Sequence, residues 1–297
     1  MTKSKRLVAF LVLPLLFLSV VIFVLFIGEV ENTRTNRSGL TVNPTGRLTV
    51  DLEFGTINID NIETTDQDHI NIAYTKEWKA KFWALRLQSV KWISELPGDF
   101  EITTKNSDSD TQSDIQIKGK FKRGREHWRE GLKWFTVDVR VTVPRRYSVT
   151  LKTASSGDIH VDNLIGAVSA EVLDGNLHLG EIQGEVSGKT SRSGGITLKG
   201  CQSSVNLTAA LGNIRAEMTT QPQHPWTLHT SESGEIDVAL HPDIAVNVDA
   251  QTQGNISSDF SIQPHRDVES RLKGAINGGG PLLKLRAAAG EIRLRRN

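Results

Sequence analysis

The sequence predicts an all-β protein, specifically a single-stack β-solenoid with coils of about 18–20 residues, together with one N-terminal transmembrane helix. Two observations carry this prediction: an uncharged apolar run at residues 7–28, and a glycine-initiated repeat that recurs from Gly157 onward. Composition agrees, because 38% hydrophobic residues are enough for a packed core. The single cysteine excludes an intramolecular disulfide framework and any multi-cysteine metal site.

The run at residues 7–28 is predicted to be an uncleaved membrane anchor. As a helix it would extend roughly 33 Å, enough to cross a hydrocarbon core of about 30 Å. Lys3, Lys5 and Arg6 precede it, so we expect the N-terminus in the cytoplasm and the rest outside. A cleaved signal peptide is the alternative, but it would carry a shorter apolar region and a small-residue cleavage site, which is absent near Gly28. The predicted location is therefore a bacterial cytoplasmic membrane, with the C-terminal domain periplasmic or extracellular.

The repeat has the pattern Gly-polar-apolar-polar-apolar, which is typical of a strand with one buried face. Glycine-led turns between strands permit the positive φ angles that bend the chain, and half-period copies give a unit of about nine residues. The gap of 36 residues between the last two copies is interpreted as two periods. Stacked coils would bury the apolar positions as continuous ladders, which predicts the solenoid. The copies are Gly157-Asp-Ile159-His-Val161, Gly175-Asn-Leu177-His-Leu179, Gly194-Gly-Ile196-Thr-Leu198, Gly212-Asn-Ile214-Arg-Ala216, Gly234-Glu-Ile236-Asp-Val238, Gly254-Asn-Ile256 and Gly290-Glu-Ile292-Arg-Leu294.

The predicted organisation has five parts. They are a cytoplasmic tail (1–6), the anchor (7–28), a polar tether (29–45), an irregular first part of the β ectodomain (46–145) and the regular solenoid repeats (146–297).

Two stretches carry a family resemblance. The progression VTVPRRYSVTLKTASSGDIHVDNLIGAVSAEVLDGNLHL and the closing INGGGPLLKLRAAAGEIRL, with the recurrent Gly-[Asp/Asn/Glu]-Ile units, resemble the putative-adhesin β-strand-repeat family. That family is a domain of unknown function found in bacterial envelope proteins, and the likeness covers roughly residues 46–297. The resemblance implies a right-handed-solenoid-like all-β fold and an envelope role, and it supplies no set of catalytic residues.

His160 and His178 occupy equivalent outward positions one coil apart, so their side chains are expected to stack about 5 Å from each other. A metal pair is one interpretation, since imidazole is a common ligand. The equivalent positions in later coils carry ordinary solvated side chains, so we expect no metal site and no cofactor.

Acidic residues recur at the predicted corners: Asp158, Glu185, Glu235 and Glu291. Calcium ligands or the paired carboxylates of a glycosidase are the alternatives to turn chemistry, and turn chemistry is favoured because Asn, Gly and Ala also fill the corner. Cys201 falls at an inward position and is predicted to be a small buried hydrophobe.

Two basic, aromatic segments are candidate surface-contact sites. Residues 76–93 form either an amphipathic stretch against a membrane or glycan, or strands that cap the open end of the solenoid. Residues 118–146 would contact anionic lipid or cell-wall polymer, or form a solvated strand–loop surface. The candidate contact residues are Trp78, Phe82, Trp83, Trp92, Arg123, Arg125, Trp128 and Arg129.

The predicted function is that of a binding or scaffold protein of the cell envelope, and not an enzyme. The formal net charge of +1 argues against a dedicated nucleic-acid partner. The expected partners are the lipid bilayer through residues 7–28 and an envelope protein, a glycan or anionic lipid. Open alternatives are an accessory role in envelope-stress sensing, a β-helix enzyme acting on polysaccharide, and self-assembly through the solenoid ends.

Overall fold

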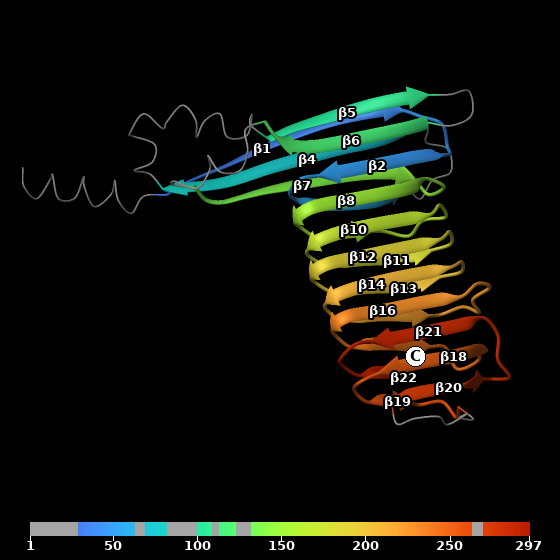
Figure 1. Cartoon of the computed structure of the whole chain (residues 1–297). Helices are drawn as coiled ribbons and strands as arrows, with labels where there is room; N and C mark the ends of the chain where they lie inside the picture. Colours follow the sequence, from blue (N-terminus) through green and yellow to red (C-terminus); the bar gives the residue numbers. More distant parts are fainter. Residues whose placement is uncertain (1–28, 63–68, 82–99, 109–112, 123–131, 263–269) are drawn as a thin grey trace, which may run out of the picture. The chain divides into compact units, whose positions relative to one another are not determined.

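The computed structural model forms regular structure only as β-strands in the part of the chain that it describes (Figure 1). The predicted anchor at residues 7–28 lies outside this part. None of the residues with a described structure belongs to a helix long and apolar enough to span a bilayer. The described residues are 29–62, 69–81, 100–108, 113–122, 132–262 and 270–297.

These residues form two sheets, each with 11 strands among the described segments. Sheet A contains, in spatial order, β1 (Glu29–Thr41), β4 (His69–Lys81), β7 (Leu132–Pro144), β3 (Thr56–Ile62), β9 (Ile159–Val161), β11 (Leu177–Ile182), β13 (Ile196–Cys201), β15 (Ile214–Met218), β17 (Ile236–Leu240), β22 (Ile292–Arg296) and β19 (Ile256–Ser258). Sheet B contains β20 (Arg271–Ile276), β18 (Val246–Thr252), β21 (Leu282–Ala287), β16 (Trp226–Ser233), β14 (Val205–Leu211), β12 (Val186–Ser193), β10 (Val168–Asp174), β8 (Ser148–Ser156), β2 (Gly46–Leu52), β6 (Ser113–Phe121) and β5 (Phe100–Asp108).

The chain's contacts divide it into two compact units, each described by itself. The smaller unit comprises residues 1–35, 75–101 and 121–136. Its described part contains an aromatic cluster in which the ring centroids of Phe100 and Phe121 lie 4.9 Å apart. The larger unit comprises residues 36–74, 102–120 and 137–297 and contains the solenoid.

The smaller unit also buries a lysine. The side chain of Lys76 is 7% exposed, and its Nζ donates a hydrogen bond to the carbonyl oxygen of Phe100. Burial, reinforced by the nearby charges of Arg34 and Lys122, lowers the pKa of Lys76.

In the larger unit, one coil consists of a strand in sheet B followed by a strand in sheet A. The chain then returns to sheet B beside its starting point, so Val168 of β10 pairs in parallel with Val186 of β12, and Val186 pairs with Val205 of β14. These offsets of 18 and 19 residues confirm the predicted coil. The paired valines are buried and stack in a column, and each fully buried valine stabilises the fold by roughly 1.5–3 kcal/mol.

Glycines line one corner of the stack because neighbouring coils approach there too closely for a side chain. Gly194 has a φ of 114°, and a Cβ atom on it would lie 1.9 Å from the carbonyl oxygen of Gly175. Buried threonines support the same corner: the hydroxyls of Thr190 and Thr230 donate to the carbonyl oxygens of Gly194 and Gly234, at 2.9 and 3.1 Å.

At both ends of the solenoid, the order of coils in space departs from their order in the sequence. The last coil, β21 with β22, is inserted between the β16–β17 coil and the β18–β19 coil. The first coil, β2 with β3, is inserted in the same way between the β6–β7 coil and the β8–β9 coil.

The interpretation of the gap between Gly254 and Gly290 as two periods in sequence order is therefore wrong. The intervening chain forms β20, which pairs antiparallel with β18. The chain then turns back, and Gly290 lies between Gly234 and Gly254 in the corner column. A repeat period counts residues but carries no signal for a reversal, so the sequence pattern missed it.

Candidate binding groove

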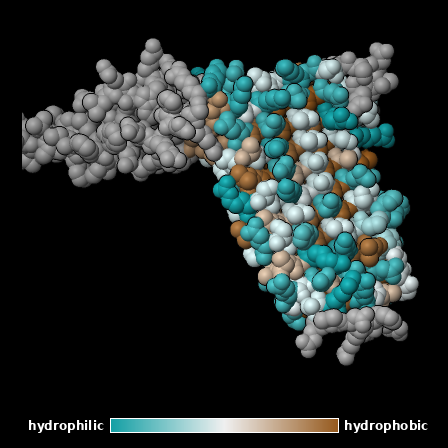
Figure 2. All heavy atoms as spheres, in the orientation of Figure 1, coloured by the Kyte–Doolittle hydropathy of each residue, from teal (hydrophilic) through white to brown (hydrophobic). Residues whose placement is uncertain are grey.

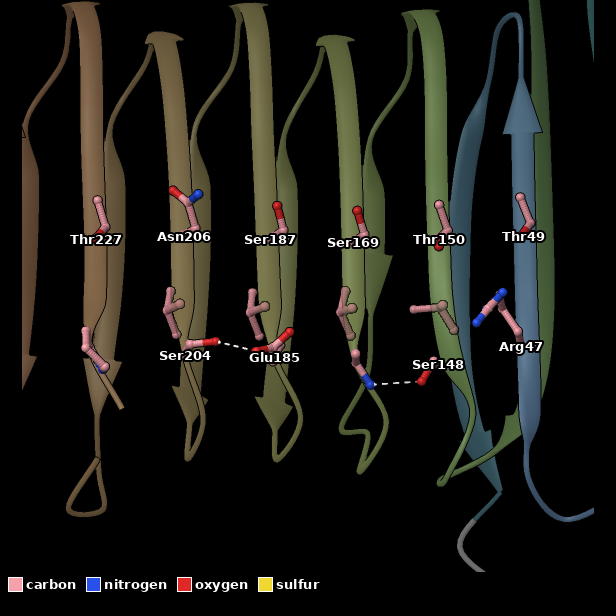
Figure 3. A pocket seen from close by; sticks show the side chains of 16 residues that line it. Arg47, Thr49, Ser148, Thr150, Ser169, Glu185, Ser187, Ser204, Asn206 and Thr227 are labelled. Atoms are coloured by element: carbon pink, nitrogen blue, oxygen red, sulfur yellow. Dashed lines mark hydrogen bonds between the residues drawn. The ribbon is translucent and has the colours of Figure 1, made fainter. Parts of the chain in front are cut away.

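The outer face of sheet B carries an open groove that crosses the stacked strands (Figure 3). Its volume is about 940 Å³. The lining side chains come from β2, β8, β10, β12, β14 and β16 and from the residues just before them: Arg47, Thr49, Ser148, Val149, Thr150, Ala167, Val168, Ser169, Glu185, Val186, Ser187, Ser204, Val205, Asn206, Pro225 and Thr227. All of them belong to the larger unit.

A row of short polar side chains runs along the groove, one from each strand. The parallel register places these side chains directly opposite one another, so adjacent members are about 4.8 Å apart. Each is the polar residue between two buried positions of its strand and therefore points outward. The row is Thr49, Thr150, Ser169, Ser187, Asn206 and Thr227.

A second row lies two residues earlier on each strand, where the chain enters sheet B. In this row the Ser148 hydroxyl accepts a hydrogen bond from the Ala167 backbone N–H at 3.2 Å. The Ser204 hydroxyl donates to a Glu185 carboxylate oxygen at 3.1 Å. Figure 3 shows both hydrogen bonds bridging adjacent coils, so these side chains hold the rim of the groove in register.

Longer side chains border the polar row on the opposite side. Two residues further along the strands, Glu171 pairs with Lys152 at 3.6 Å and with Lys189 at 4.0 Å. All three are at least 44% exposed, so these ion pairs add little to stability. On β8, β10 and β12 these side chains are longer than the Ser and Thr of the polar row and raise one border of the groove.

The groove can bind an extended polar ligand through many short contacts. Each hydroxyl both donates and accepts hydrogen bonds, and Asn206 supplies an amide that does the same. In Figure 2, hydrophilic and intermediate side chains cover much of the visible face, with apolar ones showing between them. The groove therefore combines a row of hydrogen-bonding side chains with apolar lining residues such as Val149 and Val186.

Of the eight predicted contact residues, Trp78 is the one that falls within the described segments. Trp78 belongs to β4, which continues to Lys81, so the described start of the 76–93 segment is a strand. The other seven lie outside the described residues: Phe82, Trp83, Trp92, Arg123, Arg125, Trp128 and Arg129.

The predicted stacking of His160 and His178 is confirmed. Their ring centroids are 4.6 Å apart, and the register pairs the two residues directly. Burial, followed by the charge of His178, lowers the pKa of His160. Within the described segments, no set of three or more histidine, cysteine or acidic side chains is arranged to hold a metal ion.

The polar corner residue Asp158 hydrogen-bonds to the next coil of the stack. Its carboxylate accepts the backbone N–H of Asn176 at 2.7 Å, and the Asn176 side chain accepts that of Gly195 at 2.9 Å. Asp158 and Asn176 thus each accept a hydrogen bond from a backbone N–H of the next coil. Glu291 instead accepts hydrogen bonds from Ser257 and Arg293, at 3.0 and 2.7 Å.

Cys201 is buried, as predicted, with 4% of its surface exposed. Its Sγ lies 3.3 Å from the carbonyl oxygen of Gly184, and burial raises the pKa of its thiol to about 11.

Sequence reasoning missed the residues of the groove, although a signal for them exists. Each member of the polar row is the centre of an apolar–polar–apolar triplet in the half-period copies, for example Val168-Ser169-Ala170 and Val205-Asn206-Leu207. A column of small polar residues across successive copies would have indicated a hollow outer face. The depth of the hollow depends on the flanking rows and becomes visible only once the register is known.

The geometry places this chain among β-solenoids built from two sheets of mainly parallel strands, with glycines stacked at one corner. A family profile described as "Toastrack DUF4097" matches residues 50–295, so the chain belongs to the Toastrack DUF4097 family. This confirms the resemblance drawn from the repeats.

Two solved structures of bacterial proteins are similar. One, described as a putative cell adhesion protein from Clostridium sporogenes, is 14% identical with a TM-score of 0.37, covering 89% of this chain and 100% of that one. The other, described as a putative adhesin from Bacteroides fragilis, is 10% identical with a TM-score of 0.36, covering 89% of this chain and 97% of that one. No curated protein matches the sequence.

Proposed function

We propose that this protein is an envelope binding protein, anchored through residues 7–28 in the cytoplasmic membrane, that presents the solenoid on the outer side and binds an extended glycan in the groove of sheet B. The apolar run and the preceding basic residues support the anchor and its orientation. The groove supports the ligand class.

The groove is the observation that carries this proposal. Six successive parallel strands present one short hydrogen-bonding side chain each, at a constant spacing, along an open channel of about 940 Å³. A linear chain of sugars presents hydroxyls along its whole length and can form hydrogen bonds with the polar side chains of several strands at once. Each hydrogen bond contributes about 1 kcal/mol, so the affinity depends on the number of strands that the sugar chain spans.

Binding rather than catalysis is the function that these side chains support. Among the described residues that line the groove, Glu185 is the one carboxylate, and it accepts a hydrogen bond from Ser204. Glycoside hydrolysis generally uses a pair of carboxyl groups on either side of the scissile bond. We therefore expect bound polysaccharide to be recovered at its original length after incubation.

The ligand class is tested by filling the groove. Ser187 is exposed in the middle of the polar row, so Ser187→Trp should block the channel without disturbing the core. The full-length chain would be mixed with purified bacterial cell-wall sacculi and sedimented. We expect the variant to lower the bound fraction by about fivefold or more.

The matched control is Lys189→Trp, which adds the same ring two residues further along β12, outside the groove lining. It should sediment like the unaltered chain. Equal sedimentation of Ser187→Trp and the unaltered chain would reject the groove as the binding site.

The anchor and its orientation are tested in cells. Protease added to intact cells or spheroplasts should degrade the chain beyond residue 45, while a cytoplasmic marker stays intact. Extraction with alkaline carbonate should leave the protein in the membrane fraction, and deletion of residues 7–28 should release it. Protection of the C-terminal domain would reverse the proposed topology.

A further inference from the structure

Basic side chains cluster on sheet B beyond the end of the groove, on the outer face of β18, β20 and β21. The cluster is centred on Asp249, whose carboxylate pairs with Arg286 at 3.0 Å, Arg271 at 3.4 Å and Lys273 at 3.8 Å. Lys284 occupies the register position directly opposite Asp249. Three cations thus pair with one carboxylate and a fourth lies opposite it on the next strand, which leaves an excess of three positive charges on three adjacent strands.

Arg286 is held in a fixed orientation. One of its terminal nitrogens, Nη1, donates to the carbonyl oxygens of Asp249 and Leu285 at 2.7 and 2.9 Å, and Nη2 donates to the Asp249 carboxylate at 3.0 Å. Its side chain is 24% exposed. A guanidinium carries five N–H donors, so these bonds orient Arg286 while leaving further donors for a ligand.

Asp249 pairs with several cations of this cluster but neutralises only one of their positive charges. Burial raises the pKa of Asp249, but the hydrogen bond and charge of Arg286, with the charges of Arg271 and Lys273, outweigh burial and hold this pKa below its ordinary value. The carboxylate is therefore ionised at neutral pH and contributes a single negative charge. Among the described residues, no carboxylate lies within salt-bridge distance of Lys284.

Protection of a sheet edge explains only half of the cluster. Arg271 and Lys273 lie on β20, which is the last strand of sheet B, and charged side chains on an edge strand discourage pairing with other chains. Lys284 and Arg286 lie on β21, which has β18 on one side and β16 on the other. Their charges have no edge to protect.

The cluster is collinear with the groove. The polar row that ends at Thr227 continues in register to Lys284 on β21, Asp249 on β18 and Lys273 on β20. A polymer that follows the row of hydroxyls therefore arrives directly at the cationic cluster. Planar guanidinium groups and lysine ammonium groups together are suited to tetrahedral oxyanions.

From this continuity, and resting on the groove as the proposed glycan site, we infer that the cluster of Arg271, Lys273, Lys284 and Arg286 is an anion subsite that binds a phosphate or sulfate ester carried on the same polymer. The proposed ligand is then an anionic glycan rather than a neutral one. The groove contributes length-dependent hydrogen bonding, and the cluster contributes the preference for charge.

The probe is fluorescein-labelled dextran sulfate, with neutral dextran of the same length as its uncharged counterpart. Binding to the full-length chain is followed by fluorescence anisotropy between 50 and 200 mM NaCl. The variant Lys273→Gln with Lys284→Gln removes two exposed charges and leaves Arg286 in place. We expect about tenfold weaker binding of dextran sulfate and a salt slope smaller by about two, roughly one for each cation removed.

The matched control is Lys199→Gln with Arg215→Gln, which removes two exposed positive charges from sheet A. It should stay within about twofold of the unaltered chain, and thermal melting should show both double variants folded. Unchanged binding by the cluster variant overturns the anion subsite. Equal weakening by both double variants also overturns it, because attraction then depends on net charge alone.

Two further results separate the alternatives. Binding of phosphatidylglycerol vesicles that depends on Lys273 and Lys284, without binding of dextran sulfate, would overturn the polymer assignment in favour of a lipid surface. Sacculi binding that is lost in Ser187→Trp but unaffected by Lys273→Gln with Lys284→Gln would overturn the anion subsite and leave the proposed glycan groove standing. Sacculi binding that is retained by both variants would reject the groove as well as the anion subsite.

Discussion

The imidazole rings of His160 and His178 stack face to face, with their centroids 4.6 Å apart and their planes inclined by 8°. The stacking follows directly from the parallel pairing of β9 with β11, which places the two residues opposite each other. Asn58 lies opposite His160 on its other side, on β3. The charges of Asp158 and Asp138 favour protonation of His160, but burial and the neighbouring His178 outweigh them.

This pair makes stability depend on pH. Because the pKa of His160 is lower in the folded chain than its ordinary value, the unfolded chain binds more protons near pH 6. The associated stability is present above about pH 6.5 and is lost as the pH falls through that value towards the folded pKa. We expect the urea midpoint to decrease between pH 7.5 and pH 5.5, and His160→Gln to reduce that decrease. The control is His224→Gln, which removes a histidine from an exposed loop position, and an equal effect of the two variants would contradict this assignment to His160.

The glycine corner should tolerate no side chain where coils touch. At Gly194, alanine would meet both a φ of 114° and a carbonyl oxygen 1.9 Å from its Cβ. We expect Gly194→Ala to lower the free energy of unfolding by roughly 2–4 kcal/mol, measured by urea denaturation. Gly278 separates the two causes, since its φ is 86° but nothing lies within 4 Å of its Cβ position. Gly278→Ala should cost about 1 kcal/mol. Equal costs at the two sites would show that contact between coils is not the reason for glycine.

Trp226 is buried in the solenoid core with an indole N–H that has no hydrogen-bond partner among the described atoms. A buried donor without a partner costs about 1–3 kcal/mol. Trp226→Phe removes that donor while keeping most of the ring, so we expect a change of about 1 kcal/mol or less in the free energy of unfolding. Trp226→Ala should cost about 3–5 kcal/mol, because it leaves a cavity. If both variants were equally destabilised, the N–H would have a partner in solution.

Cys201 should be inert in the folded chain. With a thiol pKa of about 11, roughly one molecule in a thousand carries the thiolate at pH 8, and the side chain is also buried. We expect iodoacetamide to label the native protein at least about a hundredfold more slowly than the protein in 8 M urea. Rapid labelling under native conditions would show that β13 opens readily.

The sequence predicted the repeating elements well because each is encoded locally. Ile159, Leu177 and Ile196 alternate with polar residues and follow a glycine step, and all three are buried in paired strands. The stacking of His160 on His178 followed from the same period. What a constant period cannot encode is a reversal, so the place of the coil that begins at Leu282 required the structure.

The groove was not predictable for a different reason. Ser169, Ser187 and Asn206 look like ordinary solvated positions when each strand is considered alone. Their significance arises from alignment across strands that are 18 or 19 residues apart, and from the longer side chains beside them. The same holds for the contact between Asp249 and Arg286, which are 37 residues apart and are brought together by the inserted β21.

The inserted C-terminal coil separates the order of synthesis from the order of assembly. When β18, β19 and β20 leave the ribosome, the strands that will lie beneath them, β21 and β22, have not yet been made. Until then β16 and β17 present a bare edge, and the segment that will finally cover the stack has no parallel neighbour in place. The distal end of the solenoid can therefore be completed only after residues 282–296 have been synthesised.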